Sequence, residues 1–279
     1  MALMELHTIS DKQDNTYPFG REIFENRTVL YHGTWSTYSP DIERRGLVSG
    51  AISLDLEGLK AVDNAHRFIG SSTFFAGFED SMPFSEREVF FAPSFWGARA
   101  YATDGGGEVV RKTIEDAERF LSICDSPESL QAQIDYWEAR LKEYGRPHPP
   151  TLAAIAALKD VANLHQHRTA IGLVRSQLVA QRDAGHPVVY AVRVDGSWFG
   201  SEWERYSELW KEFESCGGEL KCVTATIGPE RLVGRVDYPN GTDGTFMPSN
   251  LTSWDAVEQI ATEQKRHHES TRGCGASGR

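Results

Sequence analysis

The sequence predicts an α+β protein, because strand signals and helix signals fall in separate stretches of the chain. Residues 111–184 contain almost no glycine and repeat their apolar residues with helical spacing. Before and after them lie short β-branched and aromatic runs that are typical of strands. We therefore expect a β core interrupted by a helical insertion. The strands are expected at residues 28–32, 88–92, 187–194, 219–227 and 231–237.

The helices are expected where capping residues meet apolar periodicity. Ser39 as N-cap, Pro40 in the first turn and Gly46 as the stop indicate a first helix. The aromatic stretch 198–213 is a helix or a loop, and residues 50–85 have a mixed character. The remaining helices are expected at 94–102, 113–124, 127–144 and 151–182.

The two ends of the chain carry weaker signals. Residues 1–26 are polar and interrupted by proline and glycine, which predicts an N-terminal arm or a short helix. Residues 27–263 form the predicted main domain. The polar stretch 264–279 is predicted to be disordered.

Composition limits the function classes. The net charge of -11 argues against a protein that holds nucleic acid by bulk electrostatics. The four cysteines have no CxxC spacing, which favours a reducing compartment over a disulfide framework or a zinc site. No run of about 18 apolar residues and no Sec signal is found, so we expect a cytoplasmic protein or one delivered into a target cell without such a signal.

Two sequence blocks carry candidate chemistry. The first, Thr28-Val-Leu-Tyr-His-Gly-Thr34, is a β-branched run that ends in an imidazole, a glycine and a hydroxyl. The second, Val89-Phe-Phe-Ala-Pro-Ser-Phe-Trp-Gly-Ala-Arg-Ala-Tyr101, runs from an apolar strand through a Pro-Ser break into a helix. Together they resemble the first two signature blocks of the histidine-type ADP-ribosyltransferases, which cleave NAD at its nicotinamide bond and transfer ADP-ribose. Some strings are also similar to the rifamycin-modifying members of that superfamily. The resemblance implies a split, mostly antiparallel β core.

The resemblance assigns roles to residues of both blocks. It implies that His32 bonds a ribose hydroxyl of NAD, that the Gly33 backbone holds the nicotinamide amide, and that Thr34 supports the same floor. Phe90 and Tyr101, eleven positions apart, would flank the nicotinamide ring, where a cationic pyridinium gains about 0.5–2 kcal/mol per aromatic face. The family usually has tyrosine where this chain has Phe90. Phe91 is the alternative if the register shifts by one.

Two further expectations concern charged groups. Glu219 precedes a strand and matches the third block, so it is the expected catalytic carboxylate, with Glu214 of the Glu-x-Glu pair as its competitor. Gly217 stands where the arginine-modifying branch has an acidic or amide residue, which weakens the case for protein arginine as acceptor. Arg44 is the candidate for the pyrophosphate of NAD. No metal site is expected.

Other interpretations stay open. An RNA 2′-phosphotransferase has the same fold and a similar His-Gly-Thr start, and a degenerate fold without catalysis would serve as an NAD or ADP-ribose binding module. The acceptor can be a protein, a nucleic acid or a small molecule. The resemblance favours a bacterial or phage toxin or defence effector. On this interpretation the insertion governs acceptor choice or docks an antitoxin or a host target.

Overall fold

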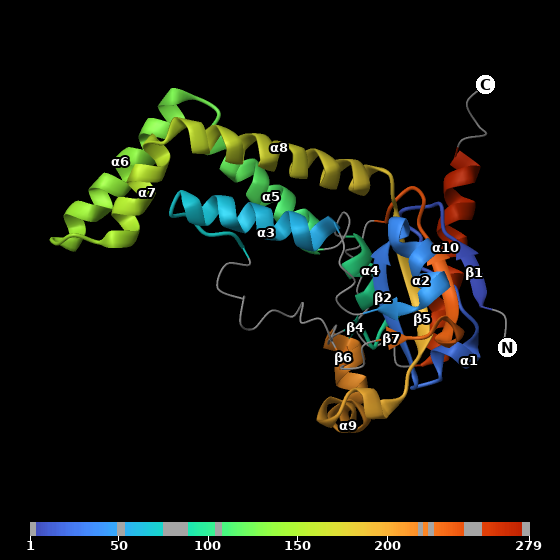
Figure 1. The fold of residues 1–279 in the computed structure, drawn as a ribbon. Coiled ribbons are helices and arrows are strands. Elements are labelled where there is room, and N and C mark those ends of the chain that lie inside the picture. The colour runs from blue at the N-terminus through green and yellow to red at the C-terminus, as the bar shows by residue number, and fades with distance from the viewer. Residues whose placement is uncertain are drawn as a thin grey trace. The chain divides into compact units, whose positions relative to one another are not determined.

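The structure is a computed structural model, and it describes most of the chain (Figure 1). The described residues are 4–48, 54–74, 89–103, 108–216, 220–222, 226–242 and 253–274. The chain divides into two compact units. The sheet unit is made of residues 1–51, 84–107 and 185–279, and the helical unit is made of residues 52–83 and 108–184.

The sheet unit is built on four strands in the order β1-β8-β5-β2. These strands are β1 (Glu5–Thr8), β2 (Val29–Trp35), β5 (Pro187–Arg193) and β8 (Leu232–Asp237). β2 and β8 pair with β5 in antiparallel fashion, whereas β1 pairs with β8 in parallel. The protein is therefore α+β as expected, but its central sheet is mixed, which corrects the prediction of a mostly antiparallel core.

Two small antiparallel pairs complete the β structure that is described. β3 (Leu47–Val48) pairs with β7 (Thr226–Ile227), and β4 (Val89–Phe91) pairs with β6 (Leu220–Cys222). The expected strand at 219–227 thus contains β6 and β7, while residues 219 and 223–225 lie outside the described residues. A single bridge between Tyr31 and Ala92 links β2 to the residue that follows β4.

Both faces of the central sheet are covered. Successive side chains of β5 lie on opposite faces of the sheet, and those on both faces are buried. On one face, Tyr31 and Val189 pack with Phe95 of α4 (Phe95–Thr103) and Val257 of α10 (Trp254–Cys274). On the other face, Leu30 and Val192 pack with Ile42 of α2 (Ser39–Arg45) and Tyr206 of α9 (Ser201–Cys216). The short helices of this unit are α1 (Arg21–Phe24), η1 (Ser36–Tyr38), η2 (Gly196–Trp198) and η3 (Pro229–Arg231).

The helical unit has a core of its own. Val62 and Ile69 pack with Phe120, Leu158 and Ile171. Its helices are α3 (Leu54–Phe68), α5 (Glu108–Ile123), α6 (Pro127–Tyr144), α7 (Pro149–Lys159) and α8 (Val161–Asp183). The expected helix 151–182 is two helices, because Asp160 leaves helical geometry and its side chain caps α8 by accepting a hydrogen bond from the Asn163 amide at 3.2 Å.

Three predicted segments differ from the structure. The expected arm at 1–26 contains β1 and α1, and its Tyr17 and Phe19 are buried in the core, since aromatic side chains gain most from burial. Residues 264–274 of the predicted disordered tail belong to α10, and residues 275–279 lie outside the described residues. The mixed region 50–85 contains α3, whose apolar face belongs to the helical unit, so this unit is larger than the expected insertion.

Candidate functional site

The first motif lies on β2, an outer strand of the central sheet. The amide of Tyr31 donates to the Ala92 carbonyl at 2.9 Å, and the Tyr31 carbonyl accepts from the Ala92 amide at 2.8 Å. Tyr31 therefore directs both backbone groups away from β5. Hydrogen-bond direction in an antiparallel ladder repeats every second residue. Gly33 thus also directs its N–H and C=O to this outer side, where no bond from another described segment reaches them.

The α carbon of Gly33 lies directly against α4. A Cβ at this position would overlap the carbonyl oxygen of Ala98 and approach the amide nitrogen of Ala102 to 2.9 Å. Any larger residue would have to push the helix away from β2. Glycine is therefore required here for close packing, and the same packing fixes α4 next to the outer edge of Gly33.

His32 is held by a backbone group that is distant in sequence. Its Nδ1 donates a hydrogen bond to the Phe90 carbonyl at 2.9 Å, because a carbonyl oxygen can only accept. Burial lowers the pKa of His32 from its ordinary value of 6.5, against a smaller upward contribution from the Phe90 bond. At neutral pH the ring is therefore uncharged, and its Nε2 carries a lone pair that can accept a hydrogen bond.

The two phenylalanines of β4 differ in environment. Phe91 is 1% exposed and belongs to the core, where its ring lies 5.9 Å from the His32 ring. Phe90 is only half-buried and, by strand alternation, lies on the other face of β4. Of the two, Phe90 is thus the ring outside the packed core.

Tyr101 lies on α4 and is 42% exposed. It is the neighbour of Ala102, whose backbone packs against Gly33. Tyr101 is therefore an exposed aromatic residue of α4 and not a core residue.

Two further residues were expected in the site, Thr34 and Arg44. Thr34 lies on β2 in the position that follows Gly33 and is half-buried. Arg44 lies in the last turn of α2 and donates to Asp41 at 2.6 Å, with its side chain 71% exposed. Among the described residues, no contact links Arg44 to His32 or Gly33, so its role at the pyrophosphate stays a prediction.

The expected catalytic carboxylate, Glu219, lies outside the described residues. Leu220, the next residue in the chain, begins β6 opposite Phe91. β4 therefore contacts both regions. Its Phe90 carbonyl bonds the His32 ring, and its Phe91 pairs with the first residue of β6. The competitor Glu214 lies within α9.

A charged cluster between α2 and β8 was not expected from the sequence. The His186 ring contacts Asp237 at 2.8 Å, and Arg235 donates to the same carboxylate at 2.6 and 2.7 Å. Arg235 also pairs with Glu43 of α2. The cluster fixes α2, and with it Arg44, to the sheet. No local pattern indicates it, because its members meet only after the strands have paired.

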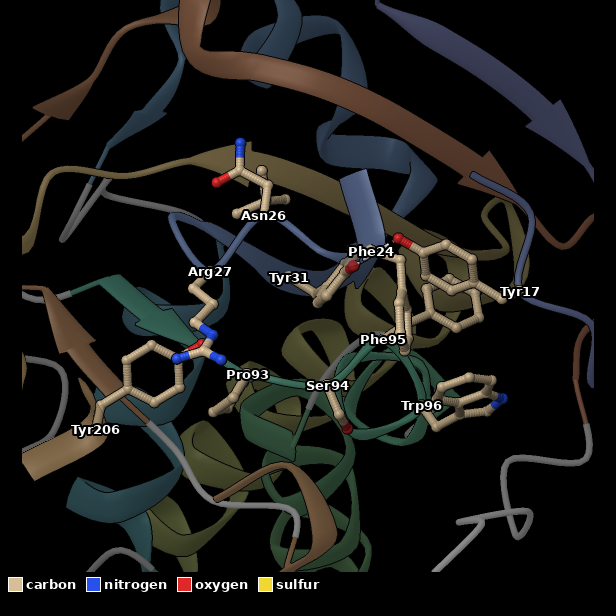
Figure 2. A pocket seen from close by; sticks show the side chains of 11 residues that line it. Tyr17, Phe24, Asn26, Arg27, Tyr31, Pro93, Ser94, Phe95, Trp96 and Tyr206 are labelled. Atoms are coloured by element: carbon tan, nitrogen blue, oxygen red, sulfur yellow. Dashed lines mark hydrogen bonds between the residues drawn. The ribbon is translucent and has the colours of Figure 1, made fainter. Parts of the chain in front are cut away.

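A pocket on the opposite face of β2 from the His32 side chain was also not expected (Figure 2). The space between its lining atoms, open solvent included, amounts to about 350 Å³, and only a small part of it is wide enough for a water molecule. Tyr17, Phe24 and Arg27 contribute to it, although the sequence assigned the first two to an arm. The signal that could have found it is the recurrence of aromatic residues in 17–24.

Comparison with protein-family models, with curated proteins and with solved structures found no match to the chain. In the part of the chain that the structure describes, no group of three or more His, Cys, Asp or Glu residues is arranged to hold a metal ion. No helix within the described ranges has the length and apolar character needed to cross a membrane.

Proposed function

We propose that the protein is an NAD-dependent mono-ADP-ribosyltransferase and that the outer edge of β2 holds the nicotinamide end of NAD. The proposal combines the sequence resemblance with the chemistry of this edge. The observation that carries it is the backbone of Gly33, whose N–H and C=O lie on the outer side of the strand. A primary carboxamide such as that of nicotinamide has one acceptor and two donor hydrogens. It would accept from the Gly33 N–H and donate to the Gly33 C=O at the same time.

The hydrogen bonding and protonation of His32 support a contact to the ribose of NAD. Its Nδ1–H is committed to the Phe90 carbonyl, which leaves Nε2 as an acceptor. A ribose hydroxyl of NAD would donate to this atom. Because burial keeps the ring neutral, the imidazole adds no positive charge next to a sugar that becomes cationic during the reaction.

The aromatic residues would hold the nicotinamide ring. Phe90 lies outside the packed core, and Tyr101 is exposed on α4, the helix that packs against Gly33. A pyridinium ring between two aromatic faces is stabilised by stacking and by attraction to the ring quadrupoles. Phe90 provides a ring face but no hydroxyl, so contacts in this position are limited to stacking.

The reaction breaks one bond and forms another. The N-glycosidic bond of NAD breaks, its electron pair leaves with nicotinamide, and the ribosyl carbon becomes an oxocarbenium ion. The carboxylate of Glu219 stabilises this charge, and an acceptor attacks from the opposite face and loses a proton. In this scheme each residue binds NAD, orients it or stabilises the charge of the oxocarbenium ion, so positioning supplies most of the catalysis.

The test uses NAD labelled in its adenylate part and the full-length protein. Release of nicotinamide is measured by chromatography, and the label is followed in separate protein, RNA, DNA and small-molecule fractions. We expect nicotinamide release with label transferred to one fraction. Absence of both NAD binding and nicotinamide release in every fraction would overturn the proposal. Release only when a 2′-phosphorylated RNA is added would favour the phosphotransferase, and binding without turnover would favour the binding module.

A further inference from the structure

Strand β1 is an outer strand of the central sheet, at the opposite edge from β2 (Figure 1). The amide of Ile9, directly after the strand, donates to the Asp237 carbonyl of β8 at 2.9 Å. Backbone groups of alternate residues point to the same side of a strand, so those of His7 also point to β8. Leu6 and Thr8 therefore direct their N–H and C=O groups to the open side of the sheet.

This open side has the properties of a pairing edge. No hydrogen bond from the described residues reaches the backbone groups of Leu6 or Thr8. Proteins commonly protect such an edge with lysine, proline or a bulge. The segment Met4-Glu-Leu-His-Thr8 contains no lysine, proline or glycine, and its pairing with β8 has no shift of register. The Leu6 side chain is also 67% exposed. The edge thus combines unpaired backbone groups with an exposed apolar side chain.

The edge is complementary to a second copy of itself. In an antiparallel pair centred on Leu6, this residue would face Leu6 of the second copy and exchange two hydrogen bonds with it, because its backbone groups point outward. Met4 would face Thr8 of the second copy with the same exchange. Glu5 would face His7 of the second copy, which places a carboxylate opposite an imidazole. Within one chain these two side chains already contact each other at 3.3 Å.

We propose that β1 is a dimerisation edge, at which two copies of the chain join their four-stranded sheets into one continuous sheet. A two-fold axis at Leu6 makes the two strands antiparallel and closes the assembly at two copies. A strand of another protein would reproduce the backbone hydrogen bonds, but the match of side chains across the axis is a property of this segment with itself. β2 lies at the other edge of the sheet, so the dimer leaves the proposed NAD edge accessible.

The test measures association of the full-length protein without NAD. Because the paired segment is short, we expect a weak dimer with a dissociation constant of about 1–100 µM. Sedimentation velocity over about 1–500 µM should show a monomer–dimer equilibrium. Amide hydrogen exchange, followed by NMR at the same concentrations, locates the interface. The amides of Leu6 and Thr8 should become protected as the concentration rises, whereas the Ile9 amide should be protected throughout because it is bonded to β8.

Two exposed leucines give a matched pair of variants. Leu6→Lys places two ammonium groups opposite each other at the axis and should weaken association by at least about 10-fold. Leu173 of α8 is 61% exposed, and Leu173→Lys should leave association unchanged. Leu6→Pro removes the outward N–H and both central hydrogen bonds of the dimer, but no bond to β8, so it should abolish association while circular dichroism shows the native fold.

Four results would overturn the proposal. The first is a monomer over the whole concentration range, and the second is association that persists unchanged in Leu6→Pro. The third is loss of association in Leu173→Lys with Leu6→Lys unaffected, which would place the interface on α8. The fourth is a dimer in which the Leu6 and Thr8 amides stay unprotected. Since none of these measurements involves NAD, their outcome is separate from that of the proposed activity.

Discussion

The sheet unit and the helical unit use polar side chains in different ways. In the helical unit, both ring nitrogens of His66 are bonded, one to the Asp116 carbonyl at 2.8 Å and one to the Ser71 hydroxyl at 3.1 Å. In the sheet unit, the His32 Nδ1 bonds the Phe90 carbonyl at 2.9 Å, whereas no hydrogen bond from the described residues reaches its Nε2. The comparison teaches that both units hold buried polar groups in fixed positions, but that of these two histidines only His32 keeps a ring nitrogen for a further partner. Fixed polar groups are what a catalytic or binding site requires.

The largest effect should come from the carboxylate next to β6. Glu219→Gln keeps the size and hydrogen bonding of the side chain but removes its charge. Nicotinamide release should therefore fall by about 10² or more while NAD binding is largely kept, the magnitude typical for the loss of an electrostatic stabiliser. The matched variant is Glu214→Gln in α9, which should retain the wild-type rate. The reverse result would assign catalysis to Glu214.

Two glycines, one from each unit, give the next comparison. Gly33→Ala places a methyl group on the Ala98 carbonyl and should destabilise the protein by about 1–3 kcal/mol with loss of NAD binding. Gly172→Ala, in the middle of α8 with no atom within 4 Å of the new methyl group, should stabilise it by about 0.5–1 kcal/mol. Urea unfolding measures both. An equal response of the two variants would contradict the close packing of α4 on β2.

Two buried histidines, again one from each unit, should make stability depend on pH. Burial lowers the pKa of both His32 and His66 from 6.5, so below this pH the unfolded chain binds protons that the folded chain does not. The free energy of unfolding should therefore fall as the pH drops below 6.5, by at most about 1.4 kcal/mol per pH unit for each histidine.

Variants that do not titrate check this prediction. His32→Asn keeps a donor for the Phe90 carbonyl, and His66→Gln keeps a donor for the Asp116 carbonyl, which the His66 Nε2 contacts at 2.8 Å. Each variant should reduce the change of the free energy of unfolding with pH. This change is measured by urea unfolding between about pH 5 and pH 7, a range that includes the ordinary pKa of histidine. Only His32→Asn should also slow nicotinamide release. Slopes that stay unchanged in both variants would show that other groups govern the pH dependence.

The smallest effects should come from the aromatic pair. Tyr101→Ala should weaken NAD binding and slow turnover by about 2-fold to 30-fold, as expected for one aromatic face on a cation. Because Tyr101 is 42% exposed, the free energy of unfolding should change by less than about 0.5 kcal/mol. Phe90→Tyr should be tolerated. Unchanged kinetics for Tyr101→Ala, measured by the same nicotinamide assay, would remove this ring from the site.

The sequence predicted the helices well where their signals are local. The helix 127–144 was predicted with the bounds of α6, because Ser126, Pro127 and Gly145 mark its ends within the segment itself. Strand β1, within the expected N-terminal arm, was missed because it forms only by pairing with β8, more than two hundred residues later. Helix α3 was missed because its sequence carries no strong cap signal. Its apolar face has partners in α5 and α8, which only the folded chain brings together.

The candidate site was predictable only in part. The residue types of the His-Gly-Thr block make His32 and Gly33 candidates, but they do not indicate what holds these residues in place. The Phe90 carbonyl as partner of His32 and the contact of α4 with Gly33 depend on tertiary packing. The extent of the helical insertion also depends on tertiary packing. Replacing residues 112–184 by a linker would expose Val62 and Ile69 of α3, so a test of its role must remove 52–83 as well.

The parallel pairing of β1 with β8 also has a consequence for synthesis. The residues of β1 leave the ribosome before their partners, Gly234 to Asp237, which are made more than two hundred residues later. At about 5–20 residues per second, the first strand waits for roughly 10 seconds or longer. The helical unit is complete in sequence at residue 184 and can fold during this interval. The sheet that holds His32 and Gly33 therefore cannot be completed before β8 has been made, and the proposed NAD site depends on this late step.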